Sequence, residues 1–256
     1  MSLQVAVPRA AGLAAGATLA TMGTMLAGQL YWTGHRSLPT QVPPRPLGHV
    51  VAGQGPPLRV VALGDSTLTG PGLANCEQVW LPAALSMVDT PRSIHYVSLA
   101  VGGSRVADAA RRVPDALRLE PDLVVVAVGA NDALHGVPVH RIRSRLDGLL
   151  RSLLRDVDVI AVANIGDLGN IARAPTPLSV ALRLRARRVR RTIERVAATH
   201  ERVVLLDVTS ADAVFRDRGV FTPDLFHPGP DGHVAWAHAV LPQLRVAVGR
   251  AGSTNG

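Results

Sequence analysis

Hydrophobic residues gather into short continuous runs that alternate with longer amphipathic stretches. Five runs have the length of strands, and they lie at 58–64, 94–101, 122–128, 158–164 and 202–208. Runs of this kind are typical of strands that are buried on both faces of a sheet. Helical periodicity occurs between and after them, near 77–88, 105–117, 138–155, 178–199 and 232–248. The alternation predicts an α/β fold, with helices on both faces of a five-stranded parallel sheet.

The first apolar stretch differs from the others because it has no charge over residues 10–34, between Arg9 and Arg36. It is long enough to span a bilayer as a helix, and Tyr31 and Trp32 stand where an interfacial belt would place them. A retained membrane anchor is the favoured interpretation, and a cleaved signal peptide is the alternative. Either predicts that the rest of the chain lies outside the cytoplasm, at the cell membrane or secreted.

The remaining pattern predicts four parts: an anchor or signal peptide over 1–35, a linker over 36–57, a globular domain over 58–250 and a tail over 251–256. The linker is identified by its prolines, since they leave few strand or helix signals. They are Pro39, Pro43, Pro44, Pro46, Pro56 and Pro57. This composition is typical of a semi-rigid spacer.

Polar residues and glycines follow four of the five predicted strands. Ser66 comes after the first, Gly102 and Gly103 after the second, Asn131 after the third, and "DLFH" (residues 224–227) after the fifth. Ligands of parallel sheets bind at the carboxyl ends of the strands, which share one edge. We therefore expect these residues to meet at that edge.

The residue types at this edge are those that acyl transfer requires. Ser66 is a weak nucleophile until a base takes its proton, and His227 is the candidate base. Asp224, three residues earlier, can fix the tautomer of that imidazole and support its charge. Three donors are candidates for an oxyanion hole: the backbone N–H groups of Ser66 and Gly103, and the side-chain amide of Asn131. The adjacent Gly102 remains an alternative to Gly103.

Four short motifs resemble those of the SGNH, or GDSL-type, hydrolase superfamily. They are "GDST" around Ser66, "SLAVGG" ending at Gly103, "GAND" containing Asn131, and "DLFHP" with Asp224 and His227. The resemblance covers roughly 58–248 in the order of the family. It implies a three-layer, flavodoxin-like α/β/α sandwich that hydrolyses carboxylic esters or thioesters through an acyl-enzyme. It also implies that neither a metal nor a cofactor takes part.

Two positions depart from the pattern of the family. Thr67 stands where many members have leucine, and Ser98 where asparagine is common. Neither would react, so the departures bear on substrate preference. Asp167 lies in a further loop at a strand end, which we expect to shape the acyl pocket. Considered alone, Ser66 would more often cap a helix, and the prediction therefore depends on its partners.

Two other functions are compatible with parts of the pattern. The "GD" and "GAND" motifs superficially resemble those of a metallophosphoesterase, but its two metals need Asp-x-His and Asn-His-Glu/Asp ligands, and these motifs lack the histidines. A membrane-tethered, non-catalytic domain that binds acyl or glycan ligands is the second alternative. Such a domain has no need to retain the base His227 and its partner Asp224.

Composition removes several further classes of function. The chain has no lysine, which excludes a Walker-type phosphate loop and Schiff-base chemistry. The net charge of +8 suggests nucleic acid as a partner. However, the densest arginine cluster, 183–195, has the spacing of a solvated helix face, so we expect no nucleic-acid binding.

The single Cys76 allows no internal disulfide. The expected partner is a small-molecule or envelope ester, and the arginine-rich usage suggests a bacterial source.

Overall fold

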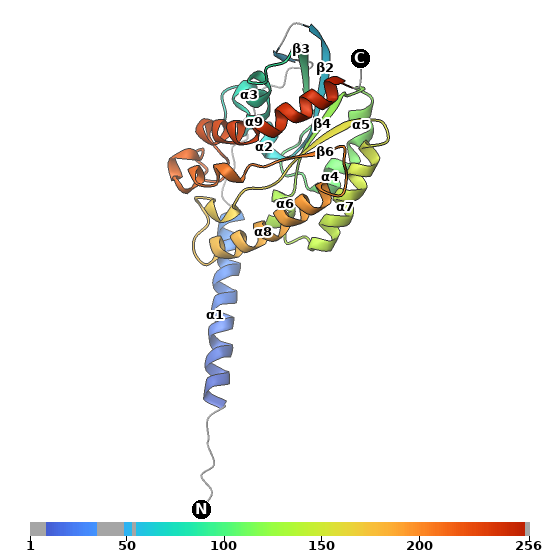
Figure 1. The fold of residues 1–256 in the computed structure, drawn as a ribbon. Helices are drawn as coiled ribbons and strands as arrows, with labels where there is room; N and C mark the ends of the chain where they lie inside the picture. Colours follow the sequence, from blue (N-terminus) through green and yellow to red (C-terminus); the bar gives the residue numbers. More distant parts are fainter. Residues whose placement is uncertain (1–8, 35–48, 53–54, 254–256) are drawn as a thin grey trace, which may run out of the picture.

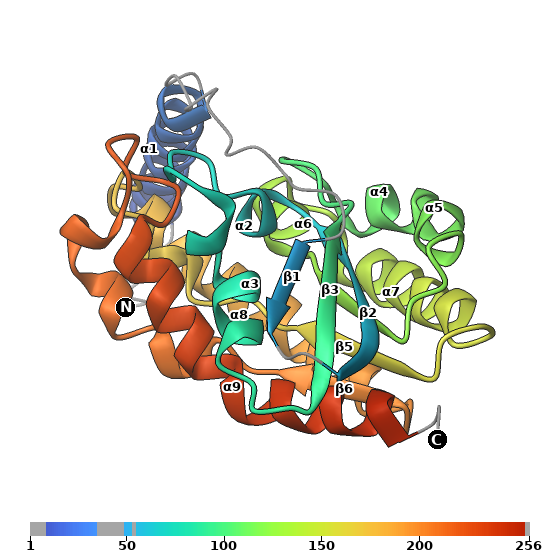
Figure 2. The ribbon, with the colours of Figure 1, turned by 90° about the horizontal axis from the view of Figure 1, so that it is seen from above.

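The computed structural model describes residues 9–34, 49–52 and 55–253 of the 256-residue chain. A six-stranded sheet forms the centre of the molecule, in the order β1-β3-β2-β4-β5-β6 (Figures 1 and 2). Five strands are parallel, and β1 pairs antiparallel with β3 at one edge. The strands are β1 (His49–Ala52), β2 (Gly55–Gly64), β3 (Arg92–Ser98), β4 (Leu123–Ala127), β5 (Val159–Ala163) and β6 (Val203–Leu206).

The predicted five-stranded parallel sheet is confirmed as β2 to β6, and the sixth strand is an addition. β1 lies inside the segment 36–57 that we expected to be a linker, and β2 begins within it at Gly55. That segment therefore contributes two stretches to the sheet, and its residues 36–48, 53 and 54 lie outside the described residues. At the other end, the last helix continues to Ser253, into the expected tail.

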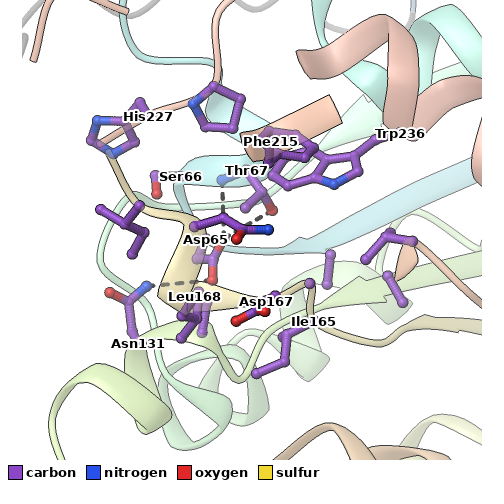
Figure 3. Close-up of a pocket in the computed structure, with 18 of the residues that line it drawn as sticks. Asp65, Ser66, Thr67, Asn131, Ile165, Asp167, Leu168, Phe215, His227 and Trp236 are labelled. Atoms are coloured by element: carbon purple, nitrogen blue, oxygen red, sulfur yellow. Dashed lines mark hydrogen bonds between the residues drawn. The ribbon is translucent and has the colours of Figure 1, made fainter. Parts of the chain in front are cut away.

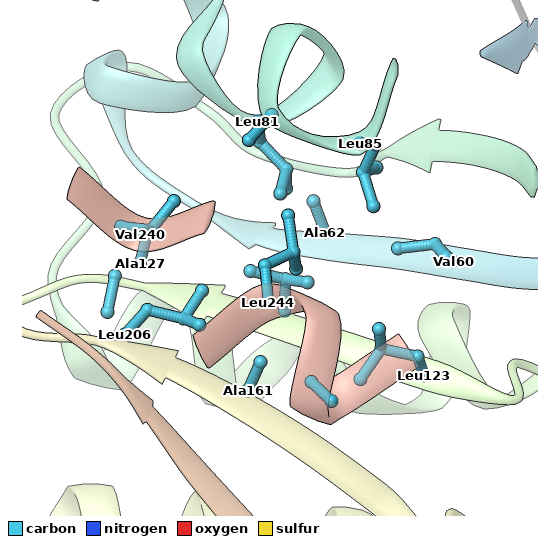
Figure 4. Packing of buried hydrophobic residues seen from close by; sticks show 14 of the residues in the cluster. Val60, Ala62, Leu81, Leu85, Leu123, Ala127, Ala161, Leu206, Val240 and Leu244 are labelled. Carbon is cyan, nitrogen blue, oxygen red and sulfur yellow. The ribbon is translucent and has the colours of Figure 1, made fainter. Parts of the chain in front are cut away.

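Helices cover both faces of the sheet, and alternate strand residues point to each face. Val60 and Ala62 of β2 pack under α3 (Trp80–Ser86) and α9 (Pro230–Ser253) (Figure 4). Val61 and Leu63 point the other way, into a second buried cluster. The helices of that second face are α4 (Val106–Arg111), α5 (Val113–Leu117), α7 (Val139–Leu153) and α8 (Leu178–Ala197). Burial on both faces accounts for the continuous apolar runs.

The arginine-rich segment is the outer side of α8. Leu182, Val189 and Ile193 are buried at helical spacing, while Arg187 and Arg191 are exposed. Side chains three and four residues apart share a helix face, which separates the two sets. The predicted solvated arginine face is therefore observed along α8.

The strand order reverses between β2 and β4, and a crevice is expected at this point. The chain passes from β2 to β3 on one side and then crosses to β4 on the other. Open α/β sheets bind ligands at such a reversal, outside the carboxyl ends of the strands. The strand ends approach closely here, because a Cβ on Gly64 would lie 2.5 Å from the Ala127 carbonyl oxygen. Gly64 is required for this close approach between β2 and β4.

The N-terminal apolar stretch forms one helix, α1 (Arg9–Gly34), which projects from the body near α8 (Figure 1). Its Gln29 joins it to the body: Nε2 donates to the Thr176 carbonyl at 3.0 Å, and Oε1 accepts from the Leu178 N–H at 3.1 Å. Within the described part of the chain, no helix has both the length and the apolarity needed to cross a membrane. The anchor or signal peptide expected over 1–35 remains a prediction.

Candidate active site

Ser66 begins the short helix α2 (Ser66–Thr69) directly after β2. The residue that caps this helix is Asp65, whose Oδ1 accepts hydrogen bonds from the Thr67 N–H at 3.0 Å and the Thr67 hydroxyl at 2.9 Å. Gly70 ends the helix with a φ of 62°. Because Asp65 performs the capping, the Ser66 hydroxyl is not needed to cap the helix.

Asp65 also connects this turn to Asn131. Asn131 lies in α6 (Ala130–Leu134), after β4, and its Nδ2 donates to Asp65 Oδ2 at 3.3 Å. Asp65 is 1% exposed, and this burial raises its pKa to about 6, against the lowering effect of the hydrogen bonds from Thr67 and Asn131. A buried carboxylate thus fixes two of the predicted site residues relative to each other.

The glycine loop after β3 is held by the same helix. Asn131 Nδ2 donates to the Ser104 carbonyl at 3.2 Å, and the buried Asp132 accepts from the Val106 N–H at 2.9 Å. Gly103 has a φ of 79°, which favours glycine. A Cβ on Gly102 would contact the Ser66 Cβ at 4.0 Å, so Gly102 is a direct neighbour of Ser66. The loop is therefore beside the serine, as the sequence predicts.

Asp224 and His227 form a hydrogen-bonded pair of side chains. Oδ2 of Asp224 lies 2.7 Å from Nδ1 of His227, and both side chains are buried. The other carboxylate oxygen, Oδ1, accepts from the Thr222 hydroxyl at 2.6 Å and from the N–H groups of Phe226 and His227. Burial alone would raise the pKa of Asp224, but these hydrogen bonds hold it well below the usual range. Asp224 is thus ionised and can accept a hydrogen bond from Nδ1 of His227.

The loop that carries this pair closes on itself. The Thr222 N–H donates to the His227 carbonyl at 2.9 Å, and the Gly229 N–H donates to the Val220 carbonyl at 2.7 Å. Leu225, at the tip, has a φ of 57°, a conformation that is unusual for leucine. Its carbonyl accepts from the N–H of Arg173, whose guanidinium lies 4.2 Å over the Phe226 ring. The contacts of Arg173 with Leu225 and Phe226 therefore stabilise the loop.

Ser66, Asn131 and His227 line the same pocket, into which their side chains point (Figure 3). Nδ1 of His227 faces Asp224, which leaves Nε2 on the opposite side of the ring. The structure therefore brings Ser66, Asn131, Asp224 and His227 to one edge of the sheet, with Gly102 and Gly103 beside them. Sequence reasoning missed Thr222, although its position two residues before Asp224 is a signal for a local hydrogen bond.

Four other polar residues have different environments. Asp167 lines the pocket and pairs with Arg183 at 2.7 Å, as a rim residue. His233 is fully buried and accepts from the Trp80 N–H at 3.2 Å, at the start of α3. Burial, and to a smaller extent the charge of the nearby His227, lowers the pKa of His233 to about 3. His135 and His140 are exposed. Packing and capping thus account for His233.

Potential metal ligands do not converge anywhere in the part of the chain that the structure describes. No group of three or more His, Cys, Asp or Glu residues could hold a metal ion there. The carboxylates of the pocket instead bond to protein groups. Asp167 pairs with Arg183, and the Asp212 carboxylate lies 3.6 Å from Arg190.

Comparison with known protein families agrees with the motifs and the fold. The sequence pattern of the GDSL-like lipase/acylhydrolase family matches residues 62–235. The chain belongs to this family. Membership makes it a carboxylic ester hydrolase, and the resemblance drawn from the four motifs is confirmed. A search of curated proteins finds no match.

Solved structures share the fold at low sequence identity. TesA is 22% identical with a TM-score of 0.62, over 74% of this chain and 99% of its own. An acetylxylan esterase, Axe2 from Geobacillus stearothermophilus, is 19% identical with a TM-score of 0.60, over 75% and 96%. The psychrotrophic esterase EstA from Pseudoalteromonas sp. is 18% identical with a TM-score of 0.60, over 73% and 97%. These likenesses show that the α/β domain has the fold of known GDSL-type enzymes.

Proposed function

We propose that the chain cleaves carboxylic esters, or thioesters, through an acyl-enzyme formed on Ser66. In this mechanism His227 takes the proton of the serine hydroxyl and later delivers it to the leaving alcohol. Asp224 holds the imidazole and stabilises its positive charge. Water then attacks the acyl-enzyme, with His227 as the base again.

The observation that carries this proposal is the bonding of the Asp224 carboxylate. It accepts four hydrogen bonds, one of them from Nδ1 of His227. A carboxylate held in this way stays ionised and keeps the imidazole in the tautomer whose Nε2 accepts a proton. A domain that only binds ligands has no use for such an arrangement, and we therefore favour catalysis over the binding alternative.

Negative charge on the carbonyl oxygen of the substrate needs donors close to Ser66. We propose the backbone N–H groups of Ser66 and Gly103 and the side-chain amide of Asn131 for this role. Nδ2 of Asn131 now donates to Asp65 and Ser104, at 3.3 and 3.2 Å. Both bonds are long, so an anionic oxygen can compete for one of these hydrogens. Asp65 would keep the amide oriented during that exchange.

Hydrolysis of p-nitrophenyl acetate by wild type and by the S66A and H227A variants tests the proposal. We expect both variants to lose at least about a thousandfold in kcat. Full activity of S66A or of H227A would overturn the mechanism. Loss of activity in EDTA that metal restores would support the metallophosphoesterase instead.

We further propose that residues 10–34 direct the enzyme to the membrane or through it. The stretch has no charged residue, and Tyr31 and Trp32 near its end are 68% and 52% exposed. Fractionation and N-terminal sequencing of the mature protein distinguish the outcomes. A membrane-bound chain with an intact N-terminus would be anchored, a shortened soluble chain would be secreted, and an intact soluble chain would contradict both.

A further inference from the structure

We infer that the pocket beside Ser66 binds a neutral, ring-bearing apolar group of the substrate. The inference rests on the proposed esterase function and names the class of ester: one in which a ring belongs to the acid or to the alcohol. Four properties of the pocket carry it: its aromatic side chains, the shape of its walls, the sign of its charges and one unpaired hydrogen-bond donor.

Aromatic residues are rare in this chain and are concentrated at the pocket. The sequence has three tryptophans, two tyrosines and three phenylalanines. All three phenylalanines and two of the tryptophans line this single pocket: Trp80, Phe215, Phe221, Phe226 and Trp236. By contrast, the buried cluster between the sheet and α4, α5, α7 and α8 contains only aliphatic residues among those described. Five of the eight aromatic side chains thus lie around one pocket.

Three of these rings form one wall of the pocket. The Phe215 ring meets Phe221 edge-on, with centroids 5.8 Å apart, and lies tilted against Trp236 at 4.9 Å. Phe215 is buried behind its two neighbours, whereas Phe221 and Trp236 are only half-buried. Their remaining surface is available to a ligand. Edge-to-face and tilted arrangements of this kind extend readily to one more ring.

Aliphatic side chains form the opposite wall, and small residues form the floor. Ile165, Leu168 and Ile171 come from the segment after β5. The last residues of β4 and β5, Ala127 and Ala163, also line the pocket and have short side chains. In Figure 3, Ser66 and His227 lie on one side of the pocket, away from Trp236 and Ile165. A group bound to Ser66 can therefore extend toward the rings.

The charges of the pocket favour a neutral ligand. Although the chain carries 27 arginines and no lysine, none of them lines the pocket. Its ionisable residues are Asp65, Asp167, Asp212 and His227. Asp167 and Asp212 are paired with Arg183 and Arg190, and no arginine among the lining residues is left to bind a carboxylate on the ligand, which disfavours anionic substrates.

One hydrogen-bond donor of the pocket is left unused. The indole N–H of Trp236 has no partner among the described residues, and its nitrogen is buried. By contrast, Asp167 and Asn170 are bonded to Arg183, and the Asn170 amide also donates to the Asp212 carbonyl. A buried donor without a partner costs free energy, and an acceptor on the ligand removes that cost.

Two series of esters without a chromophore test the inference and distinguish the two sources of the ring. The acyl series comprises methyl acetate, methyl hexanoate, methyl phenylacetate, and methyl phenylacetate with a carboxylate at the para position of the ring. The alcohol series comprises ethyl acetate, hexyl acetate and benzyl acetate. Proton release gives kcat/KM, and each value is divided by the rate of alkaline hydrolysis to correct for the reactivity of the ester.

We expect the corrected kcat/KM to be at least about tenfold higher for methyl phenylacetate than for methyl acetate, for benzyl acetate than for ethyl acetate, or in both comparisons. An advantage in the acyl series places the acid in the pocket, and an advantage in the alcohol series places the alcohol there. The para-carboxylate should lose most of this advantage. Equal values for the phenyl and short-chain esters, or a preference for the carboxylate, would overturn the inference.

Substitution of Trp236 connects the preference to the pocket. The measured quantity is the ratio of kcat/KM for the phenyl ester to that for the short-chain ester, which does not depend on how much of a variant is active. W236L should lower this ratio about tenfold, and W236F should retain most of it. W32L, at the tryptophan outside the pocket, is the matched control and should leave the ratio unchanged. An equal response of W236L and W32L would contradict the inference.

The two levels of the account fail in different ways. If no ester in either series is hydrolysed, the proposed esterase function fails. If the short-chain esters are hydrolysed but the ring gives no advantage, the esterase function stands and only the assignment of the pocket is wrong.

Discussion

Nδ2 of Asn131 donates a hydrogen bond to Oδ2 of the buried Asp65 carboxylate, at 3.3 Å. The two residues follow β2 and β4, on either side of the crevice where the strand order reverses. The other oxygen of Asp65 holds the first turn of α2, in which Ser66 is the first residue. One carboxylate therefore sets the relative positions of the proposed nucleophile and the proposed oxyanion donor.

The first prediction concerns the pH dependence of stability in Asp65→Asn. Burial raises the pKa of folded Asp65 to about 6 from its ordinary 3.8, so the folded state holds a proton that the unfolded state has released. The stabilising contribution of this bound proton is complete below pH 3.8 and is lost as the pH rises through 6. Asparagine does not titrate. The variant should therefore gain up to about 3 kcal/mol relative to wild type between pH 4 and pH 7.

Urea unfolding of both proteins at several pH values measures this difference. The quantity to follow is how the difference in unfolding free energy changes with pH. At every pH, the NH2 group of the introduced amide also lies against the NH2 group of Asn131, where neither can accept a hydrogen bond. The same opposition should lower kcat by about tenfold or more. A difference in unfolding free energy that stays constant from pH 4 to pH 7 would contradict the assignment of the raised pKa.

Thr222 is predicted to act through Asp224. Its hydroxyl donates to Asp224 Oδ1 at 2.6 Å, so Thr222→Val removes one of the bonds that lower the pKa of this carboxyl. We expect kcat/KM to fall about three- to tenfold, with the loss greatest at acid pH, where the carboxyl is less firmly ionised. Thr222→Ser keeps the hydroxyl and should restore most of the activity. If serine and valine give equal losses at every pH, the role of Thr222 is packing alone.

Two glycines provide a matched pair of alanine substitutions. A Cβ at Gly64 would lie 2.5 Å from the Ala127 carbonyl oxygen and 2.6 Å from the Leu68 side chain, in the turn before Ser66. Gly64→Ala should cost about 1–3 kcal/mol or more in the free energy of unfolding, and lower kcat as well. Gly148 is exposed in α7, and a Cβ added there would meet no atom within 4 Å. Gly148→Ala should stabilise by about 0.5–1 kcal/mol, and thermal unfolding of both variants tests the pair.

Gln29 is predicted to keep α1 against the body. Gln29→Leu removes an exposed bond to the Thr176 carbonyl and a partly buried bond to the Leu178 N–H, so the global cost should be about 1 kcal/mol. The local effect should be larger, because the Leu178 amide loses its acceptor. Hydrogen exchange of that amide should become faster in the variant, whereas the Val124 amide in β4 should not change. Unchanged exchange at Leu178 would show that this contact is not maintained in solution.

Much of the fold could be predicted because burial leaves a direct trace in the sequence. Val124 and Val126 face one side of the sheet, and Leu123 and Val125 face the other. Such a strand has to be apolar throughout, which identified β4 and its neighbours. β1 gave no such signal, because it is only four residues long and lies among prolines and glycines. Its pairing with β3 is a long-range contact that local pattern does not encode.

The proposed catalytic residues could be named from the sequence for a reason that does not apply to the pocket. Ser66, Asn131, Asp224 and His227 have side chains with specific chemistry, and each follows a predicted strand. The pocket instead depends on which apolar side chains converge in space. Its rings come from α3, from the loop segments after β6 and from α9, and apolar residues in loops do not show which way they face. The clustering of Phe215, Phe221 and Phe226 in a chain poor in aromatics was the available signal.

Covalent labelling of Ser66 tests the central claim most directly. The intact protein is treated with a fluorophosphonate at neutral pH, and its mass and the modified peptide are then determined. The account predicts one adduct per chain, on Ser66, which fails to form in S66A and forms far more slowly in H227A. An adduct elsewhere, or rapid hydrolysis of esters by a wild-type protein that the reagent never labels, would contradict the account.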